Sequence, residues 1–186
     1  MGYYGTMNIF YLDENPEIAA QMHCDKHVVK MILESAQMLS TAHRVIDGEV
    51  VGDSKGLYKT AHKNHPSTIW TRTNNENYEW LWTLMYALMK EYGRRYKKHH
   101  ATERLIHLLW EYPINITQGE FTPPPQCMPD YCKDSNSTVQ AYRNFYILEK
   151  SRFAEWKYSR PPKWFNEEHI IHFNNQKQPH IIDVMA

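Results

Sequence analysis

The chain has 186 residues, the length of one domain, and its formal net charge at pH 7 is zero. Apolar residues make up 42% of it, and its 6 Trp, 13 Tyr and 6 Phe supply enough burial to exclude a disordered body. No apolar stretch reaches the roughly 20 residues of a membrane helix, and three cysteines cannot all be paired. We therefore expect one soluble, cytoplasmic domain over residues 1–186, not a secreted disulfide scaffold.

The N-terminal third is expected to hold a short arm and one long helix. Residues 8–12 are apolar and fit a strand or an extended arm. Asn15 followed by Pro16 is a strong helix start, because Asn caps free N–H groups and Pro suits the first helical position. These signals predict a helix over 15–44, followed by a loop or hairpin over 45–60, where three glycines act as breakers.

Two further helices are predicted in the middle of the chain. Pro66 should open a short helix. Thr73 and Glu76 match a capping box, in which Thr73 caps the helix and Glu76 reaches back to the cap. A long helix with apolar residues at helical spacing should follow over 74–98, and another over 102–112.

The last third begins with a loop, residues 113–136, that contains three consecutive prolines and is long enough for a lid or a disordered segment. A helix over 137–160 should follow, and a polar, aromatic tail over 166–186. Residues 1–6 precede a second methionine and are expected to be a tag or disordered. The fold class is therefore all-α: a compact bundle of about four main helices, with a long Pro-rich loop and at most a short strand.

The first long helix carries a narrow polar stripe on an otherwise apolar circumference. Such a stripe either lines a cleft or faces solvent, and a widely apolar helix favours the cleft. At 100° per residue the stripe contains His23, His27, Lys30, Glu34, Gln37 and Thr41. The candidate catalytic residues are His23, His27, Lys30 and Glu34.

Lys30 has two interpretations. Partial burial beside other cationic groups favours a neutral amine, which is a nucleophile able to form a Schiff base, and Glu34 would act as its acid or base. Alternatively, Lys30 and Glu34 are spaced i, i+4 and form an ordinary surface ion pair.

His23 and His27 are also spaced i, i+4, which allows two imidazoles to bind one metal ion. Zn or Fe would be the metal, with His23 and His27 as ligands. No recognised metal motif is present, however, because no Glu follows His23 directly. The alternative is that the protein needs no cofactor.

Charge is unevenly distributed along the chain. Residues 1–53 hold three Lys/Arg and eight Asp/Glu, a balance of −5, whereas residues 54–104 hold ten and four, a balance of +6. A basic middle serves phosphate binding or is simply a solvated face. Tryptophans interleaved with it would stack on DNA bases or pack in the core. The candidate nucleic-acid-binding residues are His62, His65, Arg72, Arg94, Arg95 and Arg143.

Several runs together resemble a family of small proteins of tailed bacteriophages, which implies an infected bacterial host. The runs are Cys24-Asp25-Lys26-His27-Val28-Val29-Lys30-Met31, Lys63-Asn64-His65-Pro66, Asn77-Tyr78-Glu79-Trp80-Leu81, Gln126-Cys127-Met128-Pro129, Ala141-Tyr142-Arg143 with Tyr146 and Lys150, and the closing Trp156, Arg160-Pro161 and Trp164-Phe165.

A His-led helix, a His-containing turn before a long aromatic helix and a terminal Arg-Pro-aromatic run also resemble the pyrimidine dimer DNA glycosylases of the phage endonuclease V type. This resemblance implies a compact helical protein that cuts a glycosidic bond through an imine and then nicks the strand. It implies that His23 heads the active helix. In a gap-free match from His23, Lys30 occupies the position of the family's catalytic carboxylate. The family's nucleophile is the N-terminal amine, whereas here six residues precede Met7.

Three functions remain open at this point. The first is a pyrimidine DNA glycosylase and lyase, with duplex DNA or an extruded base as its partner. The second is a metal-dependent enzyme of nucleotide or DNA-base modification. The third is a non-catalytic binding protein, such as an inhibitor.

Overall fold

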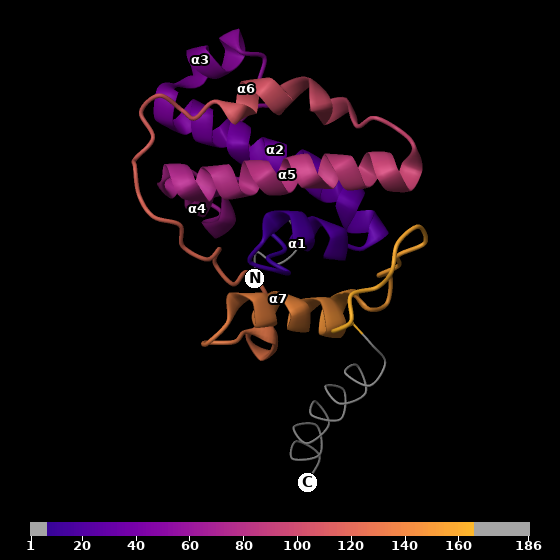
Figure 1. The fold of residues 1–186 in the computed structure, drawn as a ribbon. Coiled ribbons are helices and arrows are strands. Elements are labelled where there is room, and N and C mark those ends of the chain that lie inside the picture. The colour runs from indigo at the N-terminus through magenta and orange to yellow at the C-terminus, as the bar shows by residue number, and fades with distance from the viewer. Residues whose placement is uncertain (1–6, 166–186) are drawn as a thin grey trace.

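The computed structural model describes residues 7–165, and this part of the chain contains helices but no strand (Figure 1). The expected all-α fold is therefore confirmed. The α-helices are α1 (Pro16–Met22), α2 (Asp25–Asp47), α3 (Glu49–Ser54), α4 (Pro66–Thr73), α5 (Asn75–Tyr96), α6 (Ile106–Trp110) and α7 (Thr138–Phe145). Shorter turns are the 3₁₀ segments η1 (Ala101–Leu105) and η2 (Asp130–Cys132) and the π-helical turn η3 (Tyr146–Lys150).

The two long helices, α2 and α5, pack against each other through the middle of the fold. Figure 1 shows α3 and α6 on one side of this pair and α1 and α7 on the other. Both helices bury apolar side chains at helical spacing, as the sequence predicts. Those with almost no exposed surface include Val28, Met31, Ile32 and Leu39 of α2 and Tyr78, Leu81, Met85 and Leu88 of α5.

The N-terminal segment, residues 7–12, is a buried extended arm. It forms no strand, which agrees with the second of the two predicted alternatives. The Asn8 side chain fixes the arm by donating a hydrogen bond to the Cys127 carbonyl at 3.0 Å. A segment of the long Pro-rich loop therefore holds the start of the described chain in place.

The single helix predicted over 15–44 is wrong, because the structure divides it at His23 and Cys24. Both residues have extended backbone angles. The guanidinium of Arg95 donates to the His23 carbonyl at 2.8 Å and to the Gln21 carbonyl at 3.0 Å. The break is thus stabilised by a residue more than seventy positions away, which local sequence signals cannot reveal.

The region after α2 is also more helical than predicted. α2 continues to Asp47, and the loop or hairpin expected over 45–60 contains helix α3. Buried Arg44 organises this corner by donating to the carbonyls of Leu57 and Tyr58 at 2.9 and 2.7 Å. A Cβ built on Gly52 would lie 2.5 Å from the Arg44 side chain, so glycine is needed here for packing and not as a helix breaker.

Helix α5 agrees with the predicted 74–98, but its cap is different. Thr73 is the last residue of α4, and the Asn74 side chain accepts from the Asn77 amide at 2.9 Å. Glu76 instead accepts from the amide of Phe121 at 2.7 Å, which fastens the Pro-rich loop to the helix. In place of the helix predicted over 102–112, the structure has the 3₁₀ segment η1 followed by the short helix α6.

The helix predicted over 137–160 is wrong in its second half. Helix α7 ends at Phe145, the π turn follows, and the chain then leaves the helical path. The Glu155 carbonyl accepts from the Asp25 amide at 2.8 Å, and the Trp156 indole donates to the Met22 carbonyl at 3.1 Å. These contacts with the α1–α2 break outweigh the local tendency to remain helical.

The expectations for residues 1–6 and 166–186 lie outside the described residues. Within 7–165, no helix is long and apolar enough to cross a membrane.

Candidate active site

A small pocket opens where α2, the N-terminal arm and η3 meet. Its volume is about 40 Å³, which is room for a few water molecules. It is lined by Met7, Asn8, Phe10, His27, Lys30, Glu34 and Lys150. Three of the four predicted catalytic residues therefore share one pocket.

These three residues come from one face of α2. His27, Lys30 and Glu34 are spaced i, i+3 and i+7, which places them above one another on a helix. The polar stripe of the sequence thus lines a pocket at this point instead of facing only bulk solvent.

Glu34 is a buried carboxyl. Its side chain is 10% exposed, and its Oε2 atom has no hydrogen-bond partner among the described residues. Burial raises the pKa of Glu34 to about 7, although the nearby charges of Lys30 and Lys150 act in the opposite direction. The carboxyl can therefore gain or lose a proton near neutral pH, as a general acid or base requires.

His27 lies in a fixed position on the pocket wall. Its ring stacks on Phe10 with centroids 4.2 Å apart, and its Nδ1 lies 2.6 Å from the Tyr146 hydroxyl. Burial, together with the charges of His23 and of the nearby lysines, lowers the pKa of His27 to about 2. The imidazole is therefore neutral at working pH and cannot serve as a cationic acid.

Lys150 adds a second amine to the pocket. It is the last residue of η3, and its Nζ lies 4.6 Å from the centre of the Phe145 ring. Burial lowers the pKa of Lys150, and the charge of Lys30 lowers it further. Because π-helical turns are frequent at functional sites, the position of Lys150 on one fits a functional role.

His23 does not line this pocket. The family resemblance implies that His23 heads the active helix. The structure instead places His23 directly after the last residue of α1, before α2 begins. Its Nδ1 lies 2.6 Å from the Ala19 carbonyl, and burial lowers its pKa to about 4. His23 is therefore a neutral internal residue behind the pocket.

The proposed metal ligands are not joined by further ligands. Among residues 7–165, no group of three or more His, Cys, Asp or Glu side chains is arranged to hold a metal ion. His23 and His27 both contact the ring of Phe10.

Arg72 lies beside the predicted His62–His65 loop. Its guanidinium donates to the Lys63 carbonyl at 2.8 Å. His62 is exposed, whereas His65 is buried and caps α4 by accepting from the Ser67 amide at 3.1 Å. Arg72 and this loop are therefore neighbours, and His65 caps helix α4.

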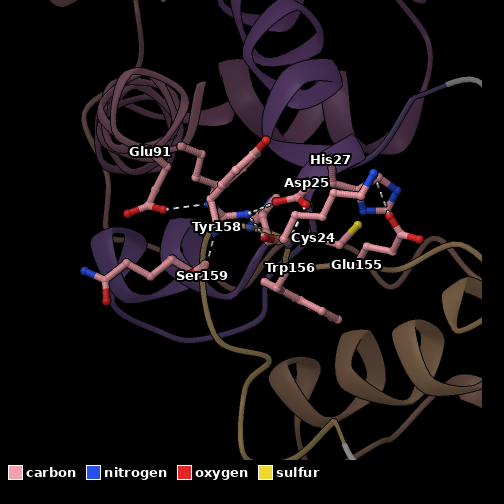
Figure 2. A network of polar contacts seen from close by, with 12 residues as sticks. Cys24, Asp25, His27, Glu91, Glu155, Trp156, Tyr158 and Ser159 are labelled. Atoms are coloured by element: carbon pink, nitrogen blue, oxygen red, sulfur yellow. Dashed lines mark hydrogen bonds and ion pairs between the residues drawn. The ribbon is translucent and has the colours of Figure 1, made fainter. Parts of the chain in front are cut away.

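Arg94 and Arg95 lie at the other end of α5. Figure 2 shows the polar network that contains Asp25, Glu91 and Tyr158. The Arg95 side chain is fully buried, 3.1 Å from Asp25 and 2.9 Å from Glu91. Arg94 is half exposed and pairs with Glu91 at 2.7 Å. This network joins the end of α5 to the break before α2 and to the segment that contains Tyr158.

Arg143 lies on α7, where it donates to the Leu12 carbonyl at 3.0 Å and faces Asp13 at 3.5 Å. The six predicted nucleic-acid-binding residues therefore come from three different parts of the fold: the loop before α4 with α4 itself, the end of α5, and α7.

The tryptophans in the basic middle of the chain pack in the core, which was one of the two predicted alternatives. Trp70 and Trp80 are buried, and their indoles donate to the Thr122 and Glu14 carbonyls at 2.8 and 2.9 Å. Trp82 is partly buried and donates to the Ile106 carbonyl at 3.1 Å.

Several pocket residues were not predicted from the sequence: Asn8, Phe10, Lys150 and the supporting Tyr146. Asn8 and Phe10 reach the pocket because the arm is extended and buried beside α2. Tyr146 and Lys150 are four positions apart in one of the runs that carry the family resemblance, and that spacing was the available signal.

Comparison with known proteins agrees with this geometry. A family model described as pyrimidine dimer DNA glycosylase matches residues 7–104, which include the arm and helices α1 to α5. Neither the curated proteins nor the solved structures give a match. Since the matched segment is more than half of the sequence, the chain belongs to the pyrimidine dimer DNA glycosylase family.

Proposed function

We propose that this chain is a pyrimidine DNA glycosylase with lyase activity, and that the pocket on α2 is its active site. One observation carries the proposal: the buried carboxyl of Glu34 lies 4.0 Å from the amine of Lys30 in the same pocket. Imine-forming glycosylase chemistry needs this combination of a nucleophile and an acid–base group.

The reaction begins when the Glu34 carboxylate takes a proton from the Lys30 ammonium and the freed amine attacks C1′ of the deoxyribose. A C1′–N bond forms, and the glycosidic bond breaks with its electron pair passing to the base, which takes the proton from Glu34. Glu34 then moves a second proton from the attacking nitrogen to O4′. The sugar ring opens and leaves a protonated imine. Loss of a C2′ proton from this imine expels the 3′ phosphate and nicks the strand.

The size of the pocket supports attack at the sugar. About 40 Å³ does not accommodate a pyrimidine ring. The edge of the deoxyribose therefore approaches the pocket while the base stays outside it. Extrusion of a nucleotide from the duplex would bring C1′ to this position.

The spacing of His27 and Glu34 also supports the proposal. In the gap-free match from His23, the family's catalytic carboxylate follows the leading histidine by seven residues, which gives Lys30. Starting from His27, the same spacing gives Glu34. We propose that the spacing from His27 to Glu34 is the one that matches the family, because His27 and Glu34 both line the pocket.

Lys30 is the proposed imine-forming residue, since it lines the pocket and is paired with the acid–base group. The family resemblance implies an N-terminal amine instead. Met7 also lines the pocket, so an α-amine at that position would reach the same space.

The test is release of a base and cleavage of a duplex that carries one cis-syn thymine dimer. The wild-type protein should cut at the dimer, and Glu34→Gln should lose at least about a hundredfold in rate. Lys90→Gln, an exposed residue of α5, is the control and should be unchanged. A wild-type protein that neither releases a base nor cuts, or a Glu34→Gln variant with full activity, contradicts the proposal.

A further inference from the structure

Three cationic side chains surround one aromatic ring beside the pocket. The Lys26 Nζ lies 4.8 Å from the centre of the Phe153 ring, and the Lys150 Nζ and the Arg152 guanidinium carbon each lie 5.9 Å from it. The same ring meets His27 edge-on, with centroids 5.6 Å apart. This Phe153 cluster is therefore continuous with the wall of the pocket.

The electrostatic contacts place these cations close to one another. Lys26, Lys30 and Lys150 each lower the pKa of His27 through their charge. Lys26 and Arg152 are exposed, whereas Lys150 is half-buried. A concentration of positive charge that is partly open to solvent attracts an anion.

The acidic groups nearby offset this charge only in part, since burial and the charges of Lys30 and Arg152 lower the pKa of Lys150 while the charge of Glu149 raises it. Glu34 is buried in the pocket. Glu149 contacts the hydroxyl of Tyr131, and Glu155 pairs with Lys157 at 3.5 Å. Among residues 7–165, Lys26, Lys150 and Arg152 form no ion pair.

The cluster joins two distant parts of the chain. Lys26 lies in the first turn of α2, within the segment that matches the family. Lys150 and Arg152 come from η3 and the residues after it, beyond residue 104 where the match ends. This later segment thus brings two cations to the rim of a pocket built on the family-matched part.

We propose that Lys26, Lys150 and Arg152 form a binding site for phosphodiester groups of the DNA strand on which the pocket acts. The inference rests on the proposed function and extends it from the reacting sugar to the flanking backbone. Cationic side chains are the usual ligands of DNA phosphates, and Phe153 keeps the three at the edge of the pocket. A phosphate bound here fixes the strand so that one sugar faces Lys30 and Glu34.

The experiment measures binding of the full chain to a fluorescent duplex with a tetrahydrofuran abasic-site analogue, which the enzyme cannot process. Dissociation constants are measured from 50 to 200 mM salt for wild type, Lys26→Gln, Lys150→Gln and Arg152→Gln. Lys90→Gln is the matched control, because its amine also lies over an aromatic ring, 4.5 Å from the centre of Tyr86, but on α5. Lys26→Arg tests whether charge alone restores binding.

Each Gln variant should weaken binding about three- to tenfold at 50 mM salt and lower the slope of log affinity against log salt by about one. Lys90→Gln should match wild type, and Lys26→Arg should restore affinity. Unchanged affinity and slope in the three variants overturn the inference, as does the absence of wild-type binding. Displacement of the duplex by micromolar thymidine monophosphate would also overturn it, since the site would then hold a single nucleotide.

Base release by wild type on the dimer duplex separates the two proposals. If wild type cuts the dimer but the three variants bind normally, the phosphate site is wrong and the glycosylase assignment stands. If the variants lose affinity but wild type releases no base, the protein binds DNA at this cluster without the proposed chemistry.

Discussion

The amine of Lys30 lies 4.0 Å from Oε1 of Glu34 across one turn of α2, yet the two side chains differ in exposure, at 49% and 10%. The predicted i, i+4 ion pair is therefore present, but only its lysine is well solvated, whereas both partners of an ordinary surface pair are. Burial makes ionisation of Glu34 costly, while the adjacent amine remains accessible to a substrate. This asymmetry underlies the proposed chemistry.

The first prediction concerns the pH dependence of activity. The pKa of Glu34 is raised to about 7, and its carboxylate form must accept the proton of the attacking amine. kcat/KM for dimer cleavage should therefore fall about tenfold per pH unit below pH 7. A pH–rate profile of Glu34→Gln should show a much lower rate without this decline, and the same decline in the variant would assign it to another group.

The second prediction concerns stability. A carboxyl pKa raised from 4.5 to about 7 means that the folded state binds the proton more tightly than the unfolded state. Stability is therefore lost as pH rises from 4.5 to 7 and stays reduced above that range. Glu34→Gln should raise the free energy of unfolding at pH 8 by on the order of 2 to 3 kcal/mol more than at pH 4. Urea denaturation at both pH values measures this, and an equal effect at both would refute the raised pKa.

The third prediction treats Tyr146 as a positioning residue. Its hydroxyl is 2.6 Å from Nδ1 of His27, whose ring packs on Phe10. Tyr146→Phe should leave this nitrogen without its partner and cost about 1 to 3 kcal/mol of stability. It should also lower kcat more than it raises KM, because the pocket wall loosens while the DNA contacts remain.

Tyr92→Phe is the control for that variant. Among the described residues, the Tyr92 hydroxyl makes no hydrogen bond, so its removal should change neither stability nor kcat appreciably. A Tyr146→Phe protein with wild-type kcat but reduced stability would show that Tyr146 is only structural.

The fourth prediction separates structure from DNA binding at the end of α5. Because Arg95 is fully buried and paired with Asp25 and Glu91, Arg95→Met should lower stability by about 3 to 5 kcal/mol. Arg94 is half exposed, so Arg94→Met should lower stability by only about 1 kcal/mol or less. Thermal denaturation tests both. Reduced DNA affinity of the folded Arg95→Met protein would support the nucleic-acid role predicted from the sequence.

Local signals in the sequence predicted the fold class and the start of most helices. Asn15 caps α1, Pro66 opens α4 and Ser137 caps α7, as expected. The errors fall where distant residues decide the backbone. Arg95 stabilises the break between α1 and α2, and Arg44 organises the corner around α3.

The site was predictable to the extent that it follows helical spacing. His27, Lys30 and Glu34 share a face of α2, so their convergence follows from the sequence. Phe10 and Lys150 reach the pocket through the buried arm and the π turn, which no periodic pattern indicates. His23 shares their spacing but lies beyond the helix break, so periodicity alone placed it wrongly.

The fifth prediction concerns the nucleophile. Lys30→Met should abolish formation of a covalent imine with dimer-containing DNA. Lys30→Arg should fail as well, because a guanidinium stays charged and cannot form an imine. Full activity of Lys30→Met, measured by strand cleavage, would leave Lys30 as a partner of Glu34 only.

The most direct test of the central claim is borohydride trapping on a duplex with one thymine dimer, followed by peptide mapping of the adduct. Borohydride reduces the imine to a stable amine and so records which nitrogen attacked C1′. The proposed active site predicts a protein–DNA adduct at Lys30 that is absent in Lys30→Met. An adduct at the N-terminal amine would replace Lys30 as the nucleophile but keep the glycosylase reaction. No adduct with wild-type protein, together with an intact dimer strand, would contradict the assignment of this pocket as a glycosylase active site.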